Sequence, residues 1–432
     1  MRPTPTSCNA RVLAQSSATL LRQLPRTVAS RRAASSACGG SPSTGLNLAA
    51  SRNPLSTVPS RTRTFASSAR LYSQVSTDGS EWKLAKVPNR GVVEVSGRDT
   101  VKLLQGLVSN DVKILASATE PHAPALVYAG FMNPQGRMLA DVFIHRQAPL
   151  QDGSPRWLLD IDSRTLPSLL AFIKKFKLRS KVKLTDVSNE YSVVQAWTSA
   201  ASQPNSTVTE QLSRDPRCPT IGYRGVVSHE THATLRDQIA SVEDEEYTIH
   251  RIMQGVAEGA LDVPEAASLP LENNLDYMHG VDFRKGCYVG QELTARTHHT
   301  GVVRKRIVPL QFYLLGTPAP DTLNVDRGAT FQLPAHLAEV RSKPVASASA
   351  TAKPARGKAA GKFTSGIYNV GLACLRLEQV QRWTDASNPT SEDGLEMSVL
   401  SADGETTLLV KPHIPKWWPE PPQPADNNDP QE

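Results

Sequence analysis

The amino-acid sequence predicts an α+β protein whose chain ends in a small β-rich domain. Strand and helix signals alternate irregularly between residues 91 and 300, which is typical of α+β folds rather than of a regular βαβ array. After Arg304 the signals are those of strands separated by turns. The longest apolar run, residues 125–132, is far shorter than the ~20 residues that a membrane-spanning helix needs, so we expect no membrane insertion.

The elements of the first region follow from apolar periodicity. β-branched residues at 91–95 predict a strand, and Ser96 or Asp99 can cap a helix that follows it. Residues 199–216 are rich in Ser, Thr, Pro and Asn and predict a surface excursion. Further strands are expected at 142–145, 157–161 and 182–185, and amphipathic helices at 166–176 and 248–258.

The carboxyl-terminal domain is expected to begin near Gly301. Within it, residues 340–362 consist largely of Ala, Ser, Lys, Pro and Arg, which predicts a disordered insert. The proline-rich tail at 415–432 is assigned as disordered, with a docking strap through its two tryptophans as the open alternative. Strands are expected at 306–312, 369–377 and 397–410.

Arginine dominates the charge of the first 72 residues. Ten arginines and no lysine, aspartate or glutamate lie in this segment, and the first acidic residue of the chain is Asp78. The arginine-rich, serine-rich and acid-free composition predicts a mitochondrial transit peptide over residues 1–72 and a location in the mitochondrial matrix. A basic arm that binds nucleic acid is the alternative, but such arms normally carry lysine as well.

The net charge changes sign without that segment. The whole chain has 48 basic and 41 acidic residues, a charge of +7, and removing the ten arginines leaves 38 basic against 41 acidic residues, or −3. The remaining chain also lacks the aromatic and basic pattern of a nucleic-acid-binding module. We therefore expect no nucleic-acid partner.

Three cysteines lie outside the predicted transit peptide: Cys218, Cys287 and Cys374. They are widely spaced and form no CxxC pair, which excludes a disulfide framework and a self-sufficient tetrahedral metal site. Cys287 is the sharpest candidate for chemistry, because the neighbouring Lys285 would favour the thiolate that binds metal clusters or attacks electrophiles. The alternative is that Cys287 is a small buried hydrophobic residue.

The residues after Cys287 add further chemistry. Gly286 and Gly290 permit tight turns, and residues 291–296 can open a helix in which Glu292 and Arg296 form an i,i+4 ion pair. His298 and His299 could in principle join Cys287 at a metal. Three ligands without a fourth in register do not make a metal site, so none is predicted.

The run 285–292 reads KGCYVGQE and resembles the KGCYxGQE signature of the YgfZ-type family of iron–sulfur cluster assembly proteins. This family belongs to the folate-binding, aminomethyltransferase-like superfamily. The match continues through 294–299, as in the eukaryotic, mitochondrial branch of the family. Four further stretches resemble the family in the right order, at residues 97–111, 133–141, 270–276 and 371–376.

The resemblance implies the fold of the glycine-cleavage T-protein (GcvT), with three subdomains around a central cavity that can hold tetrahydrofolate. Residues 73–300 would form two intertwined α+β subdomains, and residues 301–414 a β-barrel. The resemblance also implies a role with A-type scaffold proteins in the late maturation of [4Fe–4S] client enzymes such as aconitase and lipoate synthase. In that role Cys287 would be the working residue and would share a transient iron–sulfur cluster with a partner.

A tetrahydrofolate site is implied by the same resemblance. Asp141 occupies the position of the carboxylate beside the folate's reactive nitrogens, and we assign Lys285, Tyr288, Gln291 and Arg296 to the same cofactor. Tyr288 and Gln291 could instead pack the turn, and Arg296 could instead form a structural ion pair.

Two departures from the T-protein argue against a classical enzyme. Ala140 replaces the first of two acids, and Val226 replaces the acid of a Gly-Tyr-Thr-Gly-Glu run that recognises the pterin. The alternative function, a folate-dependent aminomethyl or one-carbon transferase, therefore rests on analogy of fold.

Overall fold

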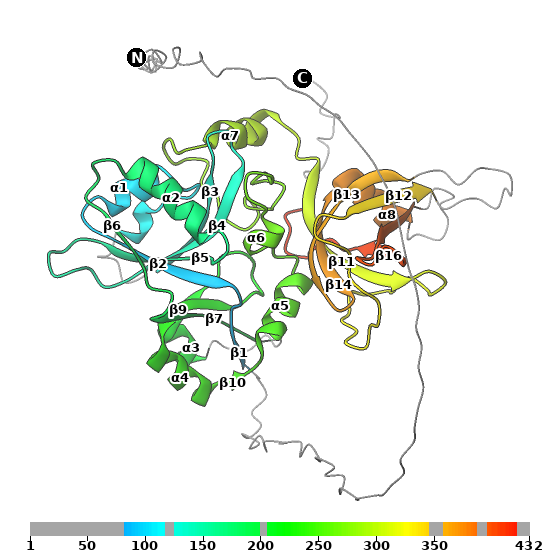
Figure 1. Cartoon of the computed structure of the whole chain (residues 1–432), viewed down its shortest axis with the longest axis horizontal. Helices are drawn as coiled ribbons and strands as arrows, with labels where there is room; N and C mark the ends of the chain where they lie inside the picture. The colour runs from blue at the N-terminus through cyan, green and yellow to red at the C-terminus, as the bar shows by residue number, and fades with distance from the viewer. Residues whose placement is uncertain (1–81, 117–124, 199–204, 345–356, 387–394, 421–432) are drawn as a thin grey trace, which may run out of the picture. The chain divides into compact units, whose positions relative to one another are not determined.

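The computed structural model describes residues 82–116, 125–198, 205–344, 357–386 and 395–420 (Figure 1). They all belong to the second of two compact units, Val75–Glu432, and the predicted transit peptide at 1–72 lies outside them. Two mixed regions of strands and helices precede a closed β-barrel, which confirms the predicted α+β class. No helix in this part of the chain is long and apolar enough to cross a membrane.

The first region is an antiparallel five-stranded sheet in the order β3-β4-β5-β2-β6, with α1 and α2 packed on one face (Figure 1). Successive side chains of a strand point to opposite faces. Ala140, Val142 and Ile144 of β4 accordingly pack beneath the helices, which leaves Asp141 and Phe143 on the opposite face. The bounds are β2 Arg90–Ser96, β3 Leu126–Met132, β4 Met138–Arg146, β5 Arg156–Asp162, β6 Lys183–Asp186, α1 Thr100–Gln105, η1 Lys113–Leu115 and α2 Leu166–Lys177.

Each strand and helix predicted between 91 and 185 overlaps one of these elements. The capping prediction was only partly correct. Asp99 is the residue before α1, but its side chain makes no capping hydrogen bond. The Asp99 carboxylate instead accepts a hydrogen bond from the backbone N–H of Lys181 at 2.6 Å, which ties the start of α1 to the segment that follows α2.

The second region is a five-stranded sheet in the order β10-β1-β7-β9-β8, accompanied by three helices. The prediction of a surface excursion at 199–216 was partly correct for its described part, 205–216, where most residues are exposed or half-buried but a short helix and a short strand form. Asn205 caps a short helix by accepting a hydrogen bond from the N–H of Thr207, and Asp215 is buried. The bounds are β1 Trp82–Lys86, β7 Tyr191–Thr198, β8 Ser213–Arg214, β9 Tyr223–Ser228, β10 Ala240–Ser241, α3 Ser206–Gln211, α4 His229–Gln238 and α5 Asp244–Met253.

The helix predicted at 248–258 starts earlier and ends earlier. Three acidic residues in the first turn of α5 favour its start at Asp244, because they face the positive end of the helix dipole. Gly255, with φ of +70°, lies just beyond its end. The chain then forms the short helix α6 (Gly259–Asp262), a series of turns, and α7 (Gln291–Thr300).

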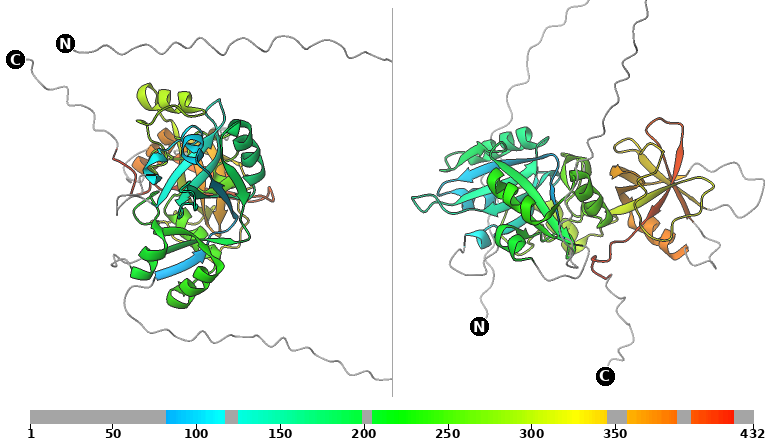
Figure 2. Two further views of the ribbon diagram at one scale, coloured as in Figure 1. Left: turned by 90° about the vertical axis from the view of Figure 1, so that its left-hand side faces the viewer. Right: turned by 90° about the horizontal axis from the view of Figure 1, so that it is seen from below.

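The carboxyl-terminal region is a closed barrel with strand order β11-β14-β13-β12-β15-β16 (Figure 2). The predicted disordered insert at 340–362 was too wide, because Val340 and Gly361 pair within the barrel and only residues 345–356 lie outside the described chain. The bounds are β11 Lys305–Leu314, β12 Glu339–Pro344, β13 Lys358–Ile367, β14 Val370–Arg376, α8 Leu377–Ala386, β15 Leu395–Leu400 and β16 Thr407–Pro412.

The start of the predicted disordered tail is docked. The indole N–H of Trp417 donates to the carbonyl oxygen of Gln254 at 2.7 Å, and the ring of Trp418 packs edge-on against Tyr277. Residues 415–420 therefore follow the docking-strap alternative rather than the disordered one. Residues 421–432 lie outside the described chain.

Candidate functional site

Cys287 lies on the exposed loop that leads into α7. Of the described cysteines, Cys218 is buried, Cys374 is half-buried and Cys287 is exposed. Burial raises the pKa of Cys218 and raises the pKa of Cys374 to about 12, so both of these thiols stay protonated at neutral pH. Cys287 is therefore the described thiol that a macromolecular partner can reach.

Lys285 fixes the loop two residues before Cys287. Its Nζ donates to the carbonyl oxygens of Gln105, Val108 and Asn110 at 2.8, 2.7 and 2.8 Å. These three bonds use all the hydrogens of the ammonium group. Burial lowers the pKa of Lys285 to about 8, and the nearby carboxylates of Asp111 and Asp282 offset part of that shift. Lys285 thus anchors the loop to the segment after α1, instead of directing a free donor to a ligand.

Val289 and Gly290 fix the loop on the other side of Cys287. The N–H of Val289 donates to the carbonyl oxygen of Gly106 at 3.0 Å, and its side chain packs on the core beneath α1 and α2. Gly290 has φ of +82°, and a Cβ at this position would overlap the carbonyl oxygen of Asn133. Only glycine fits both requirements. Cys287 is thereby presented by a short stretch that is fastened at both ends.

Tyr288 and Gln291 close the turn between the anchors. The Gln291 side-chain oxygen accepts a hydrogen bond from the backbone N–H of Tyr288 at 3.1 Å. The Tyr288 ring packs on the central core and lies 4.9 Å from Lys285 Nζ, and burial raises the pKa of Tyr288 to about 12. Both side chains therefore support the loop.

Helix α7 carries the remaining predicted residues of the motif. Arg296 is exposed, and the predicted ion pair between Glu292 and Arg296 is not among those formed by the described residues. The His298 ring stacks on Phe283 at 3.5 Å between centroids. In the described part of the chain, no three His, Cys, Asp or Glu side chains gather closely enough to hold a metal ion.

A buried ionic cluster occupies the space between the first and second sheets. Its centre is Glu258, whose Oε2 accepts hydrogen bonds from Arg217 Nη1 at 2.5 Å, Arg224 Nη1 at 3.1 Å and Tyr247 OH at 2.6 Å. We call this group the central ionic cluster; its members are Arg90, Asp141, Asp160, Asp215, Arg217, Arg224, Tyr247 and Glu258.

Asp160 joins the two sheets within this cluster. Its Oδ1 accepts from Arg90 Nε at 2.5 Å on its own sheet, and its Oδ2 accepts from Arg224 Nε at 2.6 Å on the second. The Arg224 guanidinium also lies 4.2 Å from the centre of the Phe143 ring, a favourable cation–π geometry. The side chains of Arg224 and Asp160 are completely buried.

The pKa shifts in the cluster follow from burial set against charge pairing. Burial opposes ionisation of Asp160 and Glu258, but the surrounding arginines outweigh it and hold both pKa values well below their usual range. Asp141 differs. Burial raises its pKa, and Arg90, its single ion-pair partner at 3.3 Å, offsets only part of that shift.

The surroundings of Asp141 do not fit tetrahydrofolate. Its Oδ1 accepts from the N–H of Gly259 at 3.0 Å, its Oδ2 accepts from Arg90, and the residue is 1% exposed. Arg217 and Arg224 lie against the ring of Phe143, which is on the same face of β4 as Asp141, and both guanidinium groups form buried ion pairs. Lys285, Tyr288, Gln291 and Arg296, the other residues assigned to folate, belong to the Cys287 loop and α7, where Lys285, Tyr288 and Gln291 have structural partners.

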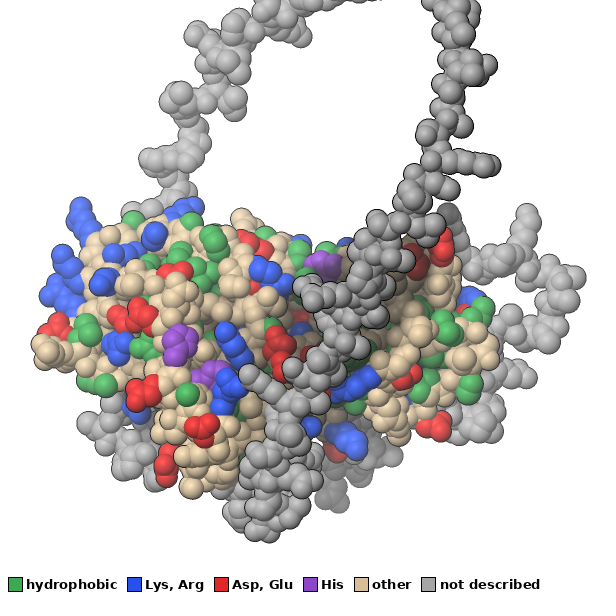
Figure 3. Space-filling view, turned by 60° about the horizontal axis from the view of Figure 1, so that its bottom comes forward, with side chains coloured by type: hydrophobic (Ala, Val, Ile, Leu, Met, Phe, Trp, Pro, Cys, Tyr) green, Lys and Arg blue, Asp and Glu red, His purple; other side chains and the backbone are tan. Residues whose placement is uncertain are grey.

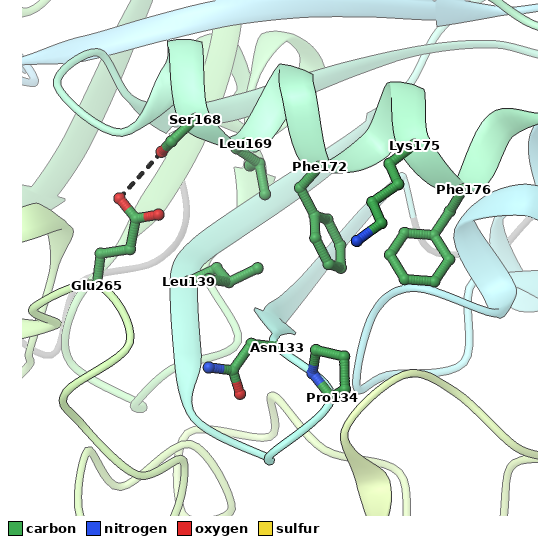
Figure 4. A pocket seen from close by; sticks show the side chains of 9 residues that line it. All are labelled: Asn133, Pro134, Leu139, Ser168, Leu169, Phe172, Lys175, Phe176 and Glu265. Atoms are coloured by element: carbon green, nitrogen blue, oxygen red, sulfur yellow. Dashed lines mark hydrogen bonds between the residues drawn. The ribbon is translucent and has the colours of Figure 1, made fainter. Parts of the chain in front are cut away.

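Two cavities open on the surface near the loop. One, of about 190 Å³, lies between α2 and the hairpin that joins β3 to β4 (Figure 4), and the other, of about 210 Å³, lies beside α7. Asp141 lines neither. Both are smaller than the roughly 300 Å³ at which pockets for drug-sized ligands begin.

Sequence reasoning missed most of the central ionic cluster. Arg224 lies inside the run 222–226, of which only Val226 was assigned a consequence from the sequence. Arg90 and Glu258 lie at the ends of predicted elements. The available signal was Arg224 itself, which stands where the Gly-Tyr-Thr-Gly-Glu run of the T-protein has threonine. An arginine in a β-branched strand needs a carboxylate partner if it is buried.

The comparisons with known proteins agree with the motif. Residues 304–420 match the family model of the CAF17 C-terminal beta-barrel domain. The chain is 70% identical to the iron–sulfur cluster assembly factor IBA57 homolog, mitochondrial, of Mycosarcoma maydis over 84% of this chain and 92% of that protein. It is 35% identical to the mouse iron–sulfur cluster assembly factor IBA57, mitochondrial, over 79% of this chain and 87% of that protein.

A solved structure confirms the predicted fold. The glycine cleavage system aminomethyltransferase T of Bartonella henselae superposes with a TM-score of 0.53 over 78% of this chain and 86% of that chain. The sequences are 12% identical, so the likeness concerns the fold alone. The two sheets and the barrel described above are thus an aminomethyltransferase-like arrangement, in which the central ionic cluster lies between the sheets.

Proposed function

The chain belongs to the IBA57 family of mitochondrial iron–sulfur cluster assembly factors, and we propose that it acts by presenting the Cys287 thiolate to a cluster held by an A-type scaffold protein. The action is late in the pathway, in the mitochondrial matrix, and serves [4Fe–4S] enzymes such as aconitase and lipoate synthase. The cluster is cargo that passes between partners rather than a resident cofactor.

One observation carries this proposal: Cys287 is exposed, yet its loop is fastened on both sides by Lys285 and by Val289–Gly290. A thiolate is the ligand that iron–sulfur clusters use most. A fixed loop lowers the entropy lost when the thiol meets its target. Because no three His, Cys, Asp or Glu side chains of the described residues gather into a metal site, the partner supplies the remaining ligands of a shared cluster.

We propose further that the protein works without resident tetrahydrofolate. Asp141 is enclosed and paired, and Val226 provides no acid for the pterin. A folate-dependent aminomethyl transfer would need a carboxylate that the substrate can reach. The central ionic cluster instead uses its carboxylates to bind arginines of the same chain.

The experiment compares Cys287→Ser with Cys374→Ala as a matched loss of a thiol. Serine is close in size to cysteine but a poor ligand for iron, and an exposed substitution should leave folding intact. In cells that rely on Cys287→Ser, we expect aconitase activity and protein lipoylation to fall while [2Fe–2S] proteins and the abundance of the variant stay normal. Cys374→Ala should retain both activities at equal abundance.

The same pair of variants can be tested with purified protein. The unit Val75–Glu432 mixed with a cluster-loaded A-type protein should give a visible spectrum that differs from the scaffold's own, and Cys287→Ser should abolish the difference. Normal aconitase activity and lipoylation in Cys287→Ser cells at normal abundance would remove Cys287 from the mechanism.

A further inference from the structure

A strongly basic turn follows α2, at the edge of the first sheet. Residues 163–185 contain no acidic residue, whereas six basic residues lie between 174 and 183. None of the six forms an ion pair among the described residues, and all but the half-buried Lys177 are exposed. We call this segment the basic turn; its cations are Lys174, Lys175, Lys177, Arg179, Lys181 and Lys183.

Leu178 stands at the tip of the basic turn. The N–H of Ser180 donates to the carbonyl oxygen of Lys177 at 2.8 Å and closes the turn. Leu178 is 86% exposed, more than any other large apolar residue in the described part of the chain. Its φ of 44° and ψ of −112° suit glycine, so the fold holds a leucine outward against backbone preference.

The arrangement concentrates charge on one edge of the protein. Arg98 is exposed and adjoins the same turn, because Asp99 bonds to the backbone N–H of Lys181. Basic side chains gather at the left edge of the face shown in Figure 3, on the side where Figure 1 places α1, α2 and β6. Without the predicted transit peptide the chain has a net charge of −3, so the positive charge of this edge is opposite in sign to the net charge of the remaining chain.

The composition of the basic turn selects among anionic partners. Lysine outnumbers arginine five to one, and lysine is depleted from protein–protein interfaces, where arginine and aromatic residues are enriched. The exposed residues of the basic turn, between 174 and 183, include no aromatic side chain that could stack on a nucleic-acid base. Lysines around an exposed aliphatic side chain are the pattern that adsorbs to an anionic lipid surface.

We propose that the basic turn attaches the protein peripherally to an anionic lipid bilayer, with the Leu178 side chain entering the interface between headgroups and acyl chains. The lysines and arginines around it bind the phosphate groups of the lipids. This attachment is independent of the Cys287 thiol, which lies on a different loop. It is adsorption to a surface and involves no membrane-spanning segment.

The test uses the compact unit Val75–Glu432, because the arginine-rich segment before it would itself bind anionic lipid. The probes are vesicles of phosphatidylcholine alone and vesicles in which part of it is replaced by phosphatidylglycerol. We expect the unit to sediment with the anionic vesicles and not with the neutral ones. Added salt should release it, because exposed charges are screened.

Two variants examine the two parts of the turn. Replacing Lys174, Lys175 and Arg179 with glutamine should weaken adsorption on the order of a hundredfold, since each cation near the surface contributes about fivefold to the affinity. Leu178→Gly should weaken it about tenfold and should fold at least as well, because glycine suits this backbone. The matched control replaces Lys358, Lys362 and Lys416, exposed lysines elsewhere, with glutamine and should bind as the wild type does.

Failure to adsorb to the anionic vesicles would overturn the proposal, as would an equal loss in the control. Binding to immobilised polyglutamate but not to vesicles would also overturn it, and would assign the basic turn to an acidic protein partner. The spectrum of the unit mixed with a cluster-loaded A-type protein should be unchanged in the triple variant. The outcome is therefore distinct from that of the Cys287→Ser experiment.

Discussion

The Cys287 loop and the central ionic cluster hold their polar groups in opposite ways. In the loop, side chains bind backbone: the Lys285 ammonium and the Gln291 amide satisfy main-chain groups, and the thiol is left exposed. In the cluster, side chains bind one another, and the charges of Arg224 and Asp160 are shut away from solvent. The first arrangement presents a reactive group, and the second leaves none to present.

This contrast supports the proposal that the chemistry takes place at the surface of an aminomethyltransferase-like fold. Where a catalyst of that fold needs a cavity with an accessible carboxylate, this chain has arginines that neutralise the carboxylates. Breaking a buried ion pair by removing one partner costs far more than the pair itself contributes, because the other charge is left uncompensated. The paired cluster therefore favours a closed centre, which agrees with the proposal that the loop meets the partner.

The largest effect is expected from removing the carboxylate at the centre of the cluster. Glu258→Ala leaves Arg217, Arg224 and the Tyr247 hydroxyl without their shared acceptor. The free energy of unfolding should fall by about 3–5 kcal/mol, the range for an uncompensated buried charge. Thermal and urea unfolding of the unit Val75–Glu432 measure this loss.

The matched control for that variant is an exposed ion pair. Glu378 and Arg382 lie one turn apart on α8 with side chains 68% and 62% exposed. Glu378→Ala should change stability by less than about 0.5 kcal/mol. A Glu258→Ala protein as stable as Glu378→Ala would show that the cluster is not a source of stability.

The pH dependence of stability sharpens the same comparison. The pKa values of Glu258 and Asp160 are held below their ordinary range in the folded state, so their stabilisation is fully present above the unfolded pKa values of about 4. It is lost as the pH falls below that value toward the folded pKa values. As the pH falls below about 4, the free energy of unfolding of Glu258→Gln should therefore decrease less than that of the wild type. Urea unfolding at a series of pH values measures this difference.

A smaller effect is expected from loosening the loop. Lys285→Met keeps most of the unbranched side chain but leaves the carbonyls of Gln105, Val108 and Asn110 without their donor. Stability should fall by about 1–3 kcal/mol, the cost of unsatisfied polar groups. Hydrogen exchange should quicken locally at 285–290, and the interaction with a cluster-loaded scaffold should weaken even though Cys287 is intact. Unchanged exchange in the loop would contradict the anchoring role.

The loop could be predicted from the sequence much better than the cluster. A contiguous run such as KGCYVGQE keeps its anchors and its thiol within a few residues, so a local pattern identifies them. The strands at 91–95 and 157–161 were equally readable, because enrichment in β-branched, aromatic and other apolar residues is a local property. Arg90, Asp160, Arg224 and Glu258 are far apart in the chain, and only the packing of two sheets brings them together.

The predicted folate residues show where this limit matters. Asp141 was assigned by its position in the hairpin, and the structure places it beside Arg90 and Gly259, neither of which is near it in sequence. Whether a carboxylate is open to a ligand depends on such distant neighbours. The local motif gives the residue type, and the tertiary contacts decide whether it is available.

The smallest expected effect is the response to tetrahydrofolate itself, and it tests the closed centre directly. We expect calorimetric titration of the unit Val75–Glu432 to detect no binding in the micromolar range, that is, none approaching about −8 kcal/mol. A ligand that bound the Asp141 carboxylate would have to separate it from Arg90 and from the Gly259 N–H. The contacts that it could form in return lack the acid that Val226 replaces.

Asp141→Ala distinguishes a site from a structural carboxylate in that titration. If Asp141 only pairs with Arg90 and Gly259, the variant should be less stable by about 1–3 kcal/mol, since both donors lose their acceptor, and its titration should match that of the wild type. If Asp141 held the folate, wild-type protein would bind it and the variant would not. Micromolar binding that Asp141→Ala abolishes would mean that the arginines can leave the centre, and the contrast between an open loop and a closed cluster would fail.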